Sequence, residues 1–162
     1  MARLEDLDPN SQAVLRKMEC PVFDTEPFAA GPPVSRRRVA IVSTAGLHRA
    51  TDRPFMLASG TGPSQTRPSD YRVIPSNTKA AELVMSHTST NFDRAGFQQD
   101  WNVVFPLDRL HELAGEQVIG SVASFHYSFM GATDPRLMEP AARRLASLLR
   151  RDHVDAVILV PV

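Results

Sequence analysis

Three histidines of this 162-residue chain each come shortly after a run of apolar residues. They are His48, His87 and His126, and the runs span residues 39–42, 83–85 and 118–122, respectively. If the runs are parallel strands, the three imidazoles gather at the edge of the sheet where the strands end. Imidazole titrates near neutral pH and therefore suits acid or base catalysis. We expect the three histidines to form one catalytic cluster in a cleft; the alternative for each is a hydrogen-bonded structural role.

A polar segment after His87 could supply substrate-binding groups, since it contains Asn91, Asp93 and Arg94. The Arg94 guanidinium can bind a substrate carboxylate through two parallel hydrogen bonds, and the Asp93 carboxylate can orient a histidine. The alternative is a surface ion pair between Asp93 and Arg94, which would contribute less than about 1 kcal/mol. These three residues form the candidate substrate-binding set.

The histidines also raise the alternative of a metal-dependent enzyme, because three histidines and an aspartate can form a zinc or iron site. No two histidines have the His-x-x-x-His spacing that places both ligands on one helix face, so we expect no metal site. Gly60 and Gly62 do not stand between a strand and a helix, which argues against a phosphate-binding loop. The chain also lacks the Gly-x-Ser-x-Gly pattern of serine hydrolases.

The first part of the chain has the pattern of an irregular arm. Four prolines lie between residues 21 and 33 and prevent regular structure there. We expect residues 1–35 to form this arm and to wrap the domain, because the apolar Val22, Phe23 and Phe28 need cover.

Residues 36–162 have the pattern of a mostly parallel sheet with helices. The apolar runs within 38–43 and 155–160 are continuous rather than alternating, as in strands that are buried on both faces. Asp134 followed by Pro135 predicts the start of a helix, since aspartate caps a helix and proline suits its first turn. A helix followed directly by a buried strand is half of a β-α-β unit. We therefore expect a three-layer, Rossmann-like α/β domain.

Composition and charge argue against several classes of partner. The chain has 18 basic and 18 acidic residues, which argues against binding of nucleic acid or of an anionic membrane. The longest apolar stretch, residues 154–162, has half the length of a membrane span and contains Asp155. The acidic start lacks the order of charges of a signal peptide, and the single cysteine, Cys20, cannot form an internal disulfide. We expect a protein of the reducing cytoplasm.

Several uncommon strings occur along the chain in a fixed order. Those in the first part are Val39–His48, Tyr71–Pro75, Leu83–His87 and Asn91–Asp100. Those in the second part are Val103–Leu110, Ile119–Val122, His126–Gly131 and Asp155–Val162. Together they resemble selenoprotein B of the glycine, sarcosine, betaine and D-proline reductases, in particular its short single-domain bacterial members. The resemblance covers nearly everything from residue 38 onward.

This resemblance implies a reductase subunit that cleaves a C–N bond reductively. In the family, a separate pyruvoyl-bearing subunit activates the amine substrate, and a thioredoxin-type system restores the redox centre. That centre is a selenocysteine or cysteine, usually paired with a second cysteine, directly after a strand like the one that ends near Val162. Amides of a following helix would stabilise its anion. The resemblance implies no cofactor besides a selenocysteine after Val162 in the full-length product.

The chain has no residue after Val162. We expect that a UGA selenocysteine codon was read as stop and that this chain is a truncated, inactive form. A strand without its following helix exposes apolar surface, so we also expect a homodimer or low stability. Two alternatives stay open: a non-redox module that binds a small amine or carboxylate, and a metal-dependent enzyme that uses the histidines.

Overall fold

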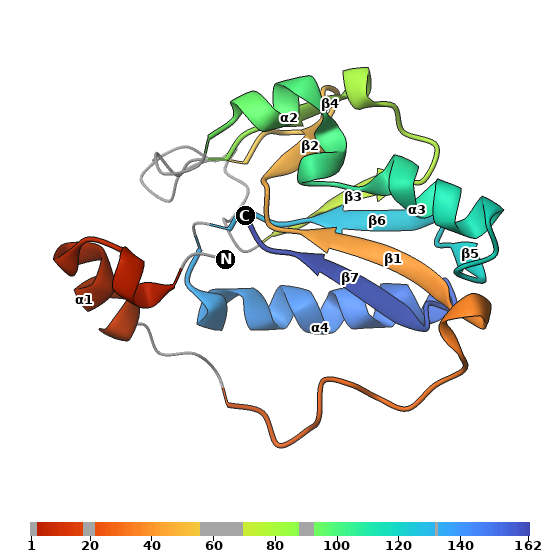
Figure 1. Ribbon diagram of the computed structural model, residues 1–162, viewed down its shortest axis with the longest axis horizontal. Coiled ribbons are helices and arrows are strands. Elements are labelled where there is room, and N and C mark those ends of the chain that lie inside the picture. The colour runs from red at the N-terminus through yellow and green to blue at the C-terminus, as the bar shows by residue number, and fades with distance from the viewer. Residues whose placement is uncertain (1–2, 18–21, 56–69, 88–92, 132) are drawn as a thin grey trace.

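The computed structural model describes residues 3–17, 22–55, 70–87, 93–131 and 133–162 and shows a mixed α/β architecture (Figure 1). Within these residues, the main sheet has five strands: β1 Arg38–Ser43, β3 Arg72–Pro75, β5 Ser121–Val122, β6 Phe125–Ser128 and β7 Ala156–Val160. A second sheet pairs β2 Leu47–Arg49 with β4 Leu83–Met85. The α-helices are α1 Pro9–Lys17, α2 Ala95–Gln99, α3 Leu107–Gly115 and α4 Pro135–Arg151. The described part of the chain also contains four short 3-10 helices: η1 Leu4–Asp6, η2 Val34–Arg36, η3 Ala80–Glu82 and η4 Trp101–Val103.

Strand β1 is the centre of the main sheet. On one side it pairs in parallel with β7, in register from Val39 opposite Ala156 to Ser43 opposite Val160. On its other side β1 pairs in parallel first with β5 and then with β6. Strand β3 is antiparallel to β6 and forms the edge opposite β7. The expectation of an α/β fold with a mostly parallel sheet is therefore confirmed.

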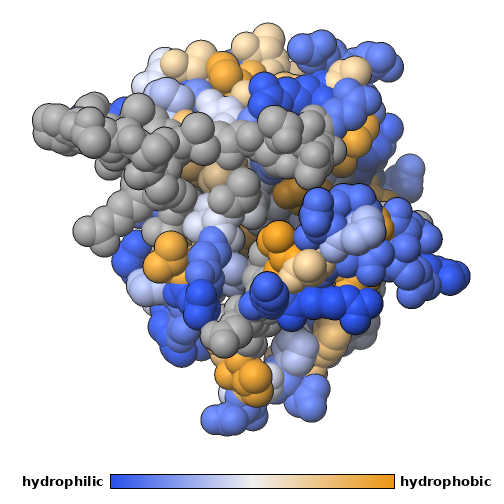
Figure 2. All heavy atoms as spheres, turned by 90° about the vertical axis from the view of Figure 1, so that its left-hand side faces the viewer, coloured by the Kyte–Doolittle hydropathy of each residue, from blue (hydrophilic) through white to orange (hydrophobic). Residues whose placement is uncertain are grey.

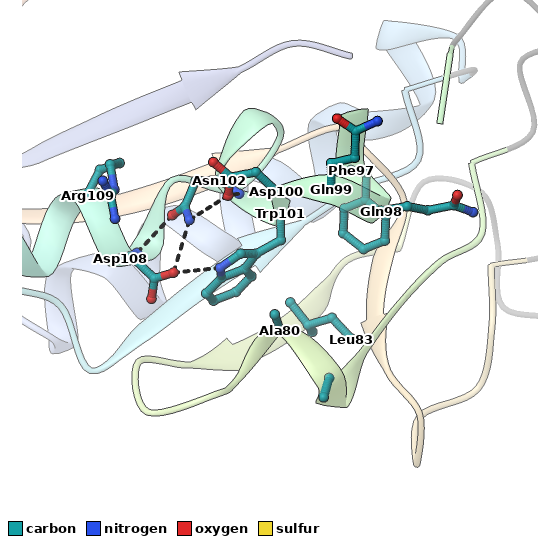
Figure 3. Close-up of a pocket in the computed structure, with 11 residues that line it drawn as sticks. Ala80, Leu83, Phe97, Gln98, Gln99, Asp100, Trp101, Asn102, Asp108 and Arg109 are labelled. Atoms are coloured by element: carbon teal, nitrogen blue, oxygen red, sulfur yellow. Dashed lines mark hydrogen bonds between the residues drawn. The ribbon is translucent and has the colours of Figure 1, made fainter. Parts of the chain in front are cut away.

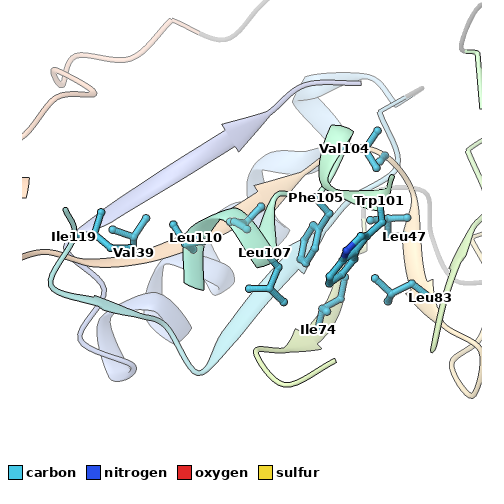
Figure 4. Close-up of a cluster of buried hydrophobic side chains, with 12 residues drawn as sticks. Val39, Leu47, Ile74, Leu83, Trp101, Val104, Phe105, Leu107, Leu110 and Ile119 are labelled. Atoms are coloured by element: carbon cyan, nitrogen blue, oxygen red, sulfur yellow. The ribbon is translucent and has the colours of Figure 1, made fainter. Parts of the chain in front are cut away.

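The two faces of β1 pack into two different hydrophobic clusters, as its continuous apolar sequence predicts. Val39 and Ile41 belong to the larger cluster, which includes side chains of α3 and η4 (Figure 4). Val42 packs against the smaller cluster, which includes Ala141 and Leu145 of α4. In Figure 1, α3 lies above the sheet and α4 below it.

Helix α4 begins where the sequence predicts it. The Asp134 carboxylate accepts a hydrogen bond from the Arg136 N–H over 2.9 Å, and Pro135 is the first helical residue. This arrangement satisfies a backbone donor at the start of the helix that has no partner within it. The helix then places β7 in parallel next to β1, which completes the predicted helix–strand unit.

Two strand predictions differ from the structure. The run 83–85 forms β4, but in the separate antiparallel sheet, with His48 inside its partner β2. The run 118–122 does not form one strand: β5 begins only at Ser121, and β6 follows with His126 inside it. Just before β5, Gly120 packs closely against η2, since a Cβ atom there would lie 2.5 Å from the backbone carbon of Arg36.

The N-terminal arm also differs from the expectation. It contains helix α1 and the 3-10 helix η2, so it is only partly irregular. Val22 is 94%, Phe23 60% and Phe28 92% exposed, and the prediction that the domain covers these three side chains is wrong. The arm meets the domain near its end, where the Arg37 Nε donates a hydrogen bond to the Pro32 carbonyl over 2.7 Å.

No helix among the described residues is both long and apolar enough to cross a membrane. Figure 2 views the molecule from the side toward which the carboxyl ends of β1, β6 and β7 point. The apolar side chains visible on this face form small groups that hydrophilic side chains separate.

Candidate functional site

The carboxyl ends of β1 and β7 are held together by Thr44. Its N–H donates a hydrogen bond to the Val160 carbonyl over 3.0 Å. Its hydroxyl oxygen accepts from the Val162 N–H over 2.8 Å and lies 3.3 Å from the Val162 carbonyl oxygen. Its carbonyl accepts from the Gly131 N–H over 2.8 Å. A Cβ atom on Gly131 would lie 2.9 Å from that carbonyl oxygen and would also collide with the Val162 carbonyl, so only glycine fits. We call Thr44, Gly131 and Val162 the Thr44 clamp.

A turn at Gly46 brings the segment after β4 against this edge. Gly46 has a φ of +66°, a conformation that side chains with a Cβ atom disfavour. Its N–H donates to the Phe129 carbonyl over 2.8 Å, and its carbonyl accepts from the Ser86 N–H over 3.0 Å. A Cβ atom on Gly46 would lie 3.1 Å from the His87 backbone nitrogen. The turn therefore fixes His87 next to the Thr44 clamp.

His87 is buried and contacts the last residue of the chain. Burial lowers the pKa of the His87 imidazole below its usual 6.5, a hydrogen bond to the backbone of Val162 raises this pKa, and the positive charge of Arg94 lowers it further. The balance is a lowered pKa, so the ring is neutral at neutral pH. The Arg94 guanidinium donates a hydrogen bond to the His87 carbonyl. His87 is thus held from both its side chain and its backbone.

His48 is linked to the same segment through Ser86. The His48 Nδ1 lies 2.8 Å from the Arg49 carbonyl oxygen, and the Nε2 lies 2.7 Å from the Ser86 hydroxyl. Because a carbonyl can only accept, Nδ1 carries a hydrogen, and the Ser86 hydroxyl is the hydrogen-bond partner of Nε2. The structure therefore connects His48 to the residue directly before His87.

His126 lies elsewhere, inside the core. Its ring is fully buried, its Nδ1 accepts a hydrogen bond from the Ile41 N–H over 3.0 Å, and it meets the Phe105 ring edge-on at 6.0 Å between ring centres. Burial lowers the pKa of His126 to about 4, and the nearby positive charge of His111 lowers it as well. The ring lies beside the middle of β1, between the residues of β1 that pair with β5 and those that pair with β6.

The structure therefore brings two of the three histidines together. His48 and His87 flank Ser86 at the carboxyl edge, whereas His126 is the second residue of β6. The predicted position of His126 beyond the end of its strand is wrong, and a fully buried ring does not line a cleft. The sequence pattern was misleading there because His126 follows the run 118–122, which is not the strand that carries it.

The candidate substrate-binding residues have other contacts. Asn91 lies outside the described residues. The exposed Asp93 carboxylate accepts from the Ala95 N–H over 2.8 Å, at the start of α2. The Arg94 guanidinium reaches the His87 carbonyl, so in this structure it supports a histidine. Substrate binding by these residues stays a prediction.

A pocket of about 530 Å³ lies next to η4 and α3, away from the Thr44 clamp (Figure 3). Its polar groups bind one another: the Asp108 carboxylate accepts from the Trp101 Nε1 over 2.7 Å and from the Asn102 amide over 3.0 Å. The Asp100 carboxylate accepts from the Asn102 N–H over 2.9 Å. Hydrogen bonds from Asn102 lower the pKa of Asp100 and of Asp108. These contacts cap η4 and hold it against α3, so the network is explained without a ligand.

Metal binding finds no support in the part of the chain that the structure describes, where no three His, Cys, Asp or Glu side chains gather as a ligand set. Nothing in the sequence pattern assigned a role to Ser86 or Gly131, and Thr44 stood out only as a polar neighbour of the strand before His48. The available signal for Thr44 was its position directly after the strand 38–43, while the role of Gly131 depends on a contact with a residue far away in the sequence.

Comparison with known protein families identifies the chain. The family model of glycine/sarcosine/betaine reductase selenoprotein B matches residues 13–162. The chain belongs to this family. The resemblance seen in the sequence is therefore confirmed, and the Thr44 clamp and His87 lie within the matched region.

Two curated relatives are similar to the chain. D-proline reductase subunit gamma of Acetoanaerobium sticklandii is 31% identical over 123 residues, which are 75% of this chain and 47% of the relative. Sarcosine reductase complex component B subunit beta of Peptoclostridium acidaminophilum is 33% identical over 141 residues, which are 86% of this chain and 31% of the relative. The chain thus spans less than half the length of either relative. No solved structure shows a significant match.

Proposed function

We propose that the chain is the part of a selenoprotein B-type reductase component that holds the redox residue at the carboxyl end of β7. The component would cleave the C–N bond of a glycine-, sarcosine-, betaine- or D-proline-type substrate reductively. A pyruvoyl-bearing subunit would activate the substrate, and a thioredoxin-type dithiol would return the electrons. Family membership supports this proposal, and so do the names of both relatives, which describe subunits of reductases.

The observation that carries the proposal is the contact between His87 and Val162. By the resemblance, a selenocysteine or cysteine would come directly after the strand that ends here, and this residue would supply a reactive selenolate or thiolate. A neutral imidazole can take up the proton that a selenol or thiol releases. Burial keeps His87 neutral at neutral pH, and the Thr44 clamp fixes the backbone at which such a residue would be attached.

The residues around His87 have supporting roles in this proposal. Arg94 positions His87 through its carbonyl, and the Ser86 hydroxyl, hydrogen-bonded to His48, holds the backbone before it. The catalytic role expected for His126 is not part of the proposal, because its ring is fully buried and its Nδ1 is engaged with the Ile41 N–H. The same proposal includes three further expectations. They are a three-layer Rossmann-like arrangement, a division into an arm of residues 1–35 and a domain of residues 36–162, and a cytoplasmic location.

The test is the thiol pKa of a chain extended after Val162 by the Cys-x-x-Cys motif. Alkylation by iodoacetamide as a function of pH should reveal a thiol with a pKa well below the usual value of about 8.5. Substituting His87→Asn should raise this pKa by about one unit, whereas His153→Asn, at an exposed histidine with a φ of +53°, should leave it unchanged. Equal thiol pKa values in the parent chain and in the His87→Asn variant would exclude the proposed role of His87.

A further inference from the structure

Strand β7 has an exposed apolar edge. Among the described residues it pairs only with β1, and it forms one edge of the main sheet (Figure 1). Val157 and Ile158 are each 37% exposed and Leu159 is 72% exposed. No charged residue and no proline occurs between Ala156 and Val160.

The opposite edge of the same sheet is built differently. Strand β3 contains Arg72 at its start and Pro75 at its end, and Val73 is its one large apolar side chain that is exposed. Natural edge strands commonly carry charges or prolines, which discourage pairing with another chain. By this criterion β3 is a protected edge, whereas β7 has the composition of an interior strand.

Both faces of β7 need cover as well. Ile158 is in register with Ile41 and shares its face, that of the larger hydrophobic cluster. Leu159 is in register with Val42 and lies on the opposite face. Strands of parallel sheets are normally covered on both faces by helices or loops. A partner that completes β7 must therefore bring a strand for its edge together with further structure for its faces.

We propose that β7 is an interior strand of the assembled reductase component, and that its free edge pairs with a strand from the region that the longer relatives have in addition to the matched part. That region is large, because the chain spans 47% of one relative and 31% of the other. It can supply both a strand that pairs with the free edge of β7 and further structure that covers the two faces of β7. The inference rests on family membership and on the two sheet edges, and not on the reductase chemistry proposed above.

A second copy of this chain fits the observations less well. Two β7 strands related by a two-fold axis would cover each other's edge, but they would bring no layer to either face. A five-residue strand pair alone also falls short of the roughly 1,000 Å² that a stable interface buries. A self-associated dimer through β7 is therefore the main competing outcome of the test.

The test is site-specific cross-linking in cells of the source organism. A photoreactive amino acid, p-benzoylphenylalanine, replaces Leu159 on β7 in one version of the chain and Val73 on β3 in the control. After irradiation, mass spectrometry identifies the cross-linked peptide. We expect cross-links from position 159 to a peptide that aligns with the part of the relatives outside the matched region, on a separate polypeptide or on a longer product of the same gene. We expect at least tenfold less of this product from position 73.

Other outcomes would overturn the proposal. They are cross-links from position 159 to a second copy of residues 1–162, cross-links to an unrelated protein, equal products from both positions, and no product from either. Amide hydrogen exchange of the purified chain, which should be fast at residues 156–160 and slower at 38–43, confirms separately that the chain is folded with β7 at an edge. Because no step of this test measures substrate reduction, it can succeed where the proposed reductase function fails.

Discussion

Gly131 lies against the carbonyl of Val162 with no room for a Cβ atom. The two residues are 31 positions apart in the sequence, and the Thr44 side chain and backbone join them. The carboxyl end of β7 is therefore fixed by the segment after β6, which makes the packing at Gly131 a sensitive probe of the candidate site.

Substituting Gly131→Ala should push the backbone of Thr44 and Val162 apart. We expect a loss of about 1–3 kcal/mol in the free energy of unfolding, as is typical of overpacking in a well-packed region. The measurement is urea unfolding followed by circular dichroism. Gly115→Ala is the matched control, because no atom lies within 4 Å of a Cβ atom there, and it should be neutral or slightly stabilising. Equal effects of the two substitutions would contradict the clamp.

Protonation of His126 should destabilise the fold in acid. The pKa of His126 is about 4 in the folded protein against 6.5 in the unfolded chain, so the unfolded state binds more protons between these values. Stability due to this group is complete above pH 6.5 and is lost as the pH falls toward 4. The lowered pKa corresponds to a loss of about 3 kcal/mol over this range.

The His126→Gln variant isolates this effect, because glutamine does not titrate and its side-chain oxygen can accept from the Ile41 N–H. We expect the variant to be less stable than the parent at pH 7 and its free energy of unfolding to change less between pH 6.5 and pH 4. His87, whose pKa is also lowered, and the carboxylates remain in both proteins, so their contributions cancel in the comparison. Parallel pH profiles for the two proteins would contradict the prediction.

The hydrogen bond between Ser86 and His48 should stabilise the small sheet. Substituting Ser86→Ala removes the hydroxyl from a buried imidazole nitrogen and should cost about 1–2 kcal/mol. Ser147→Ala on α4 is a suitable control, because alanine is favoured within a helix and the residue lies away from the small sheet. The readout is thermal unfolding, together with amide exchange at residues 47–49 and 83–85. Faster exchange confined to these two strands would support the role, and unchanged exchange would refute it.

Protein purified without added metal should contain less than about 0.1 equivalent of zinc, iron or copper. The reason is that no ligand set gathers among the described residues and that both ring nitrogens of His48 and the Nδ1 of His126 are engaged in other hydrogen bonds. Inductively coupled plasma mass spectrometry measures this directly. One equivalent of any of these metals would revive the alternative of a metal-dependent enzyme.

The elements whose signals are local were predictable from the sequence alone. Strand β1, strand β7 and the start of α4 follow from continuous apolar runs and from the Asp134–Pro135 pair, because the physical causes act within a few residues. The family could also be read from strings of residues. The run 83–85 forms a strand before His87, but it belongs to the small sheet, and the place of His87 beside the main sheet comes from the turn at Gly46.

Contacts between distant segments decided the rest. The run 83–85 pairs with β2 and not with the main sheet, and Gly120 packs against the backbone of Arg36, 84 positions earlier in the chain. His126 is buried at the place where β1 changes its pairing partner from β5 to β6, and its Nδ1 there accepts the hydrogen bond of the Ile41 N–H. The sequence by itself determined which residues form the central strands and α4, since backbone preference and apolar patterning are local. Only the tertiary structure decided which histidine meets Val162, because burial and proximity arise from packing between residues far apart along the chain.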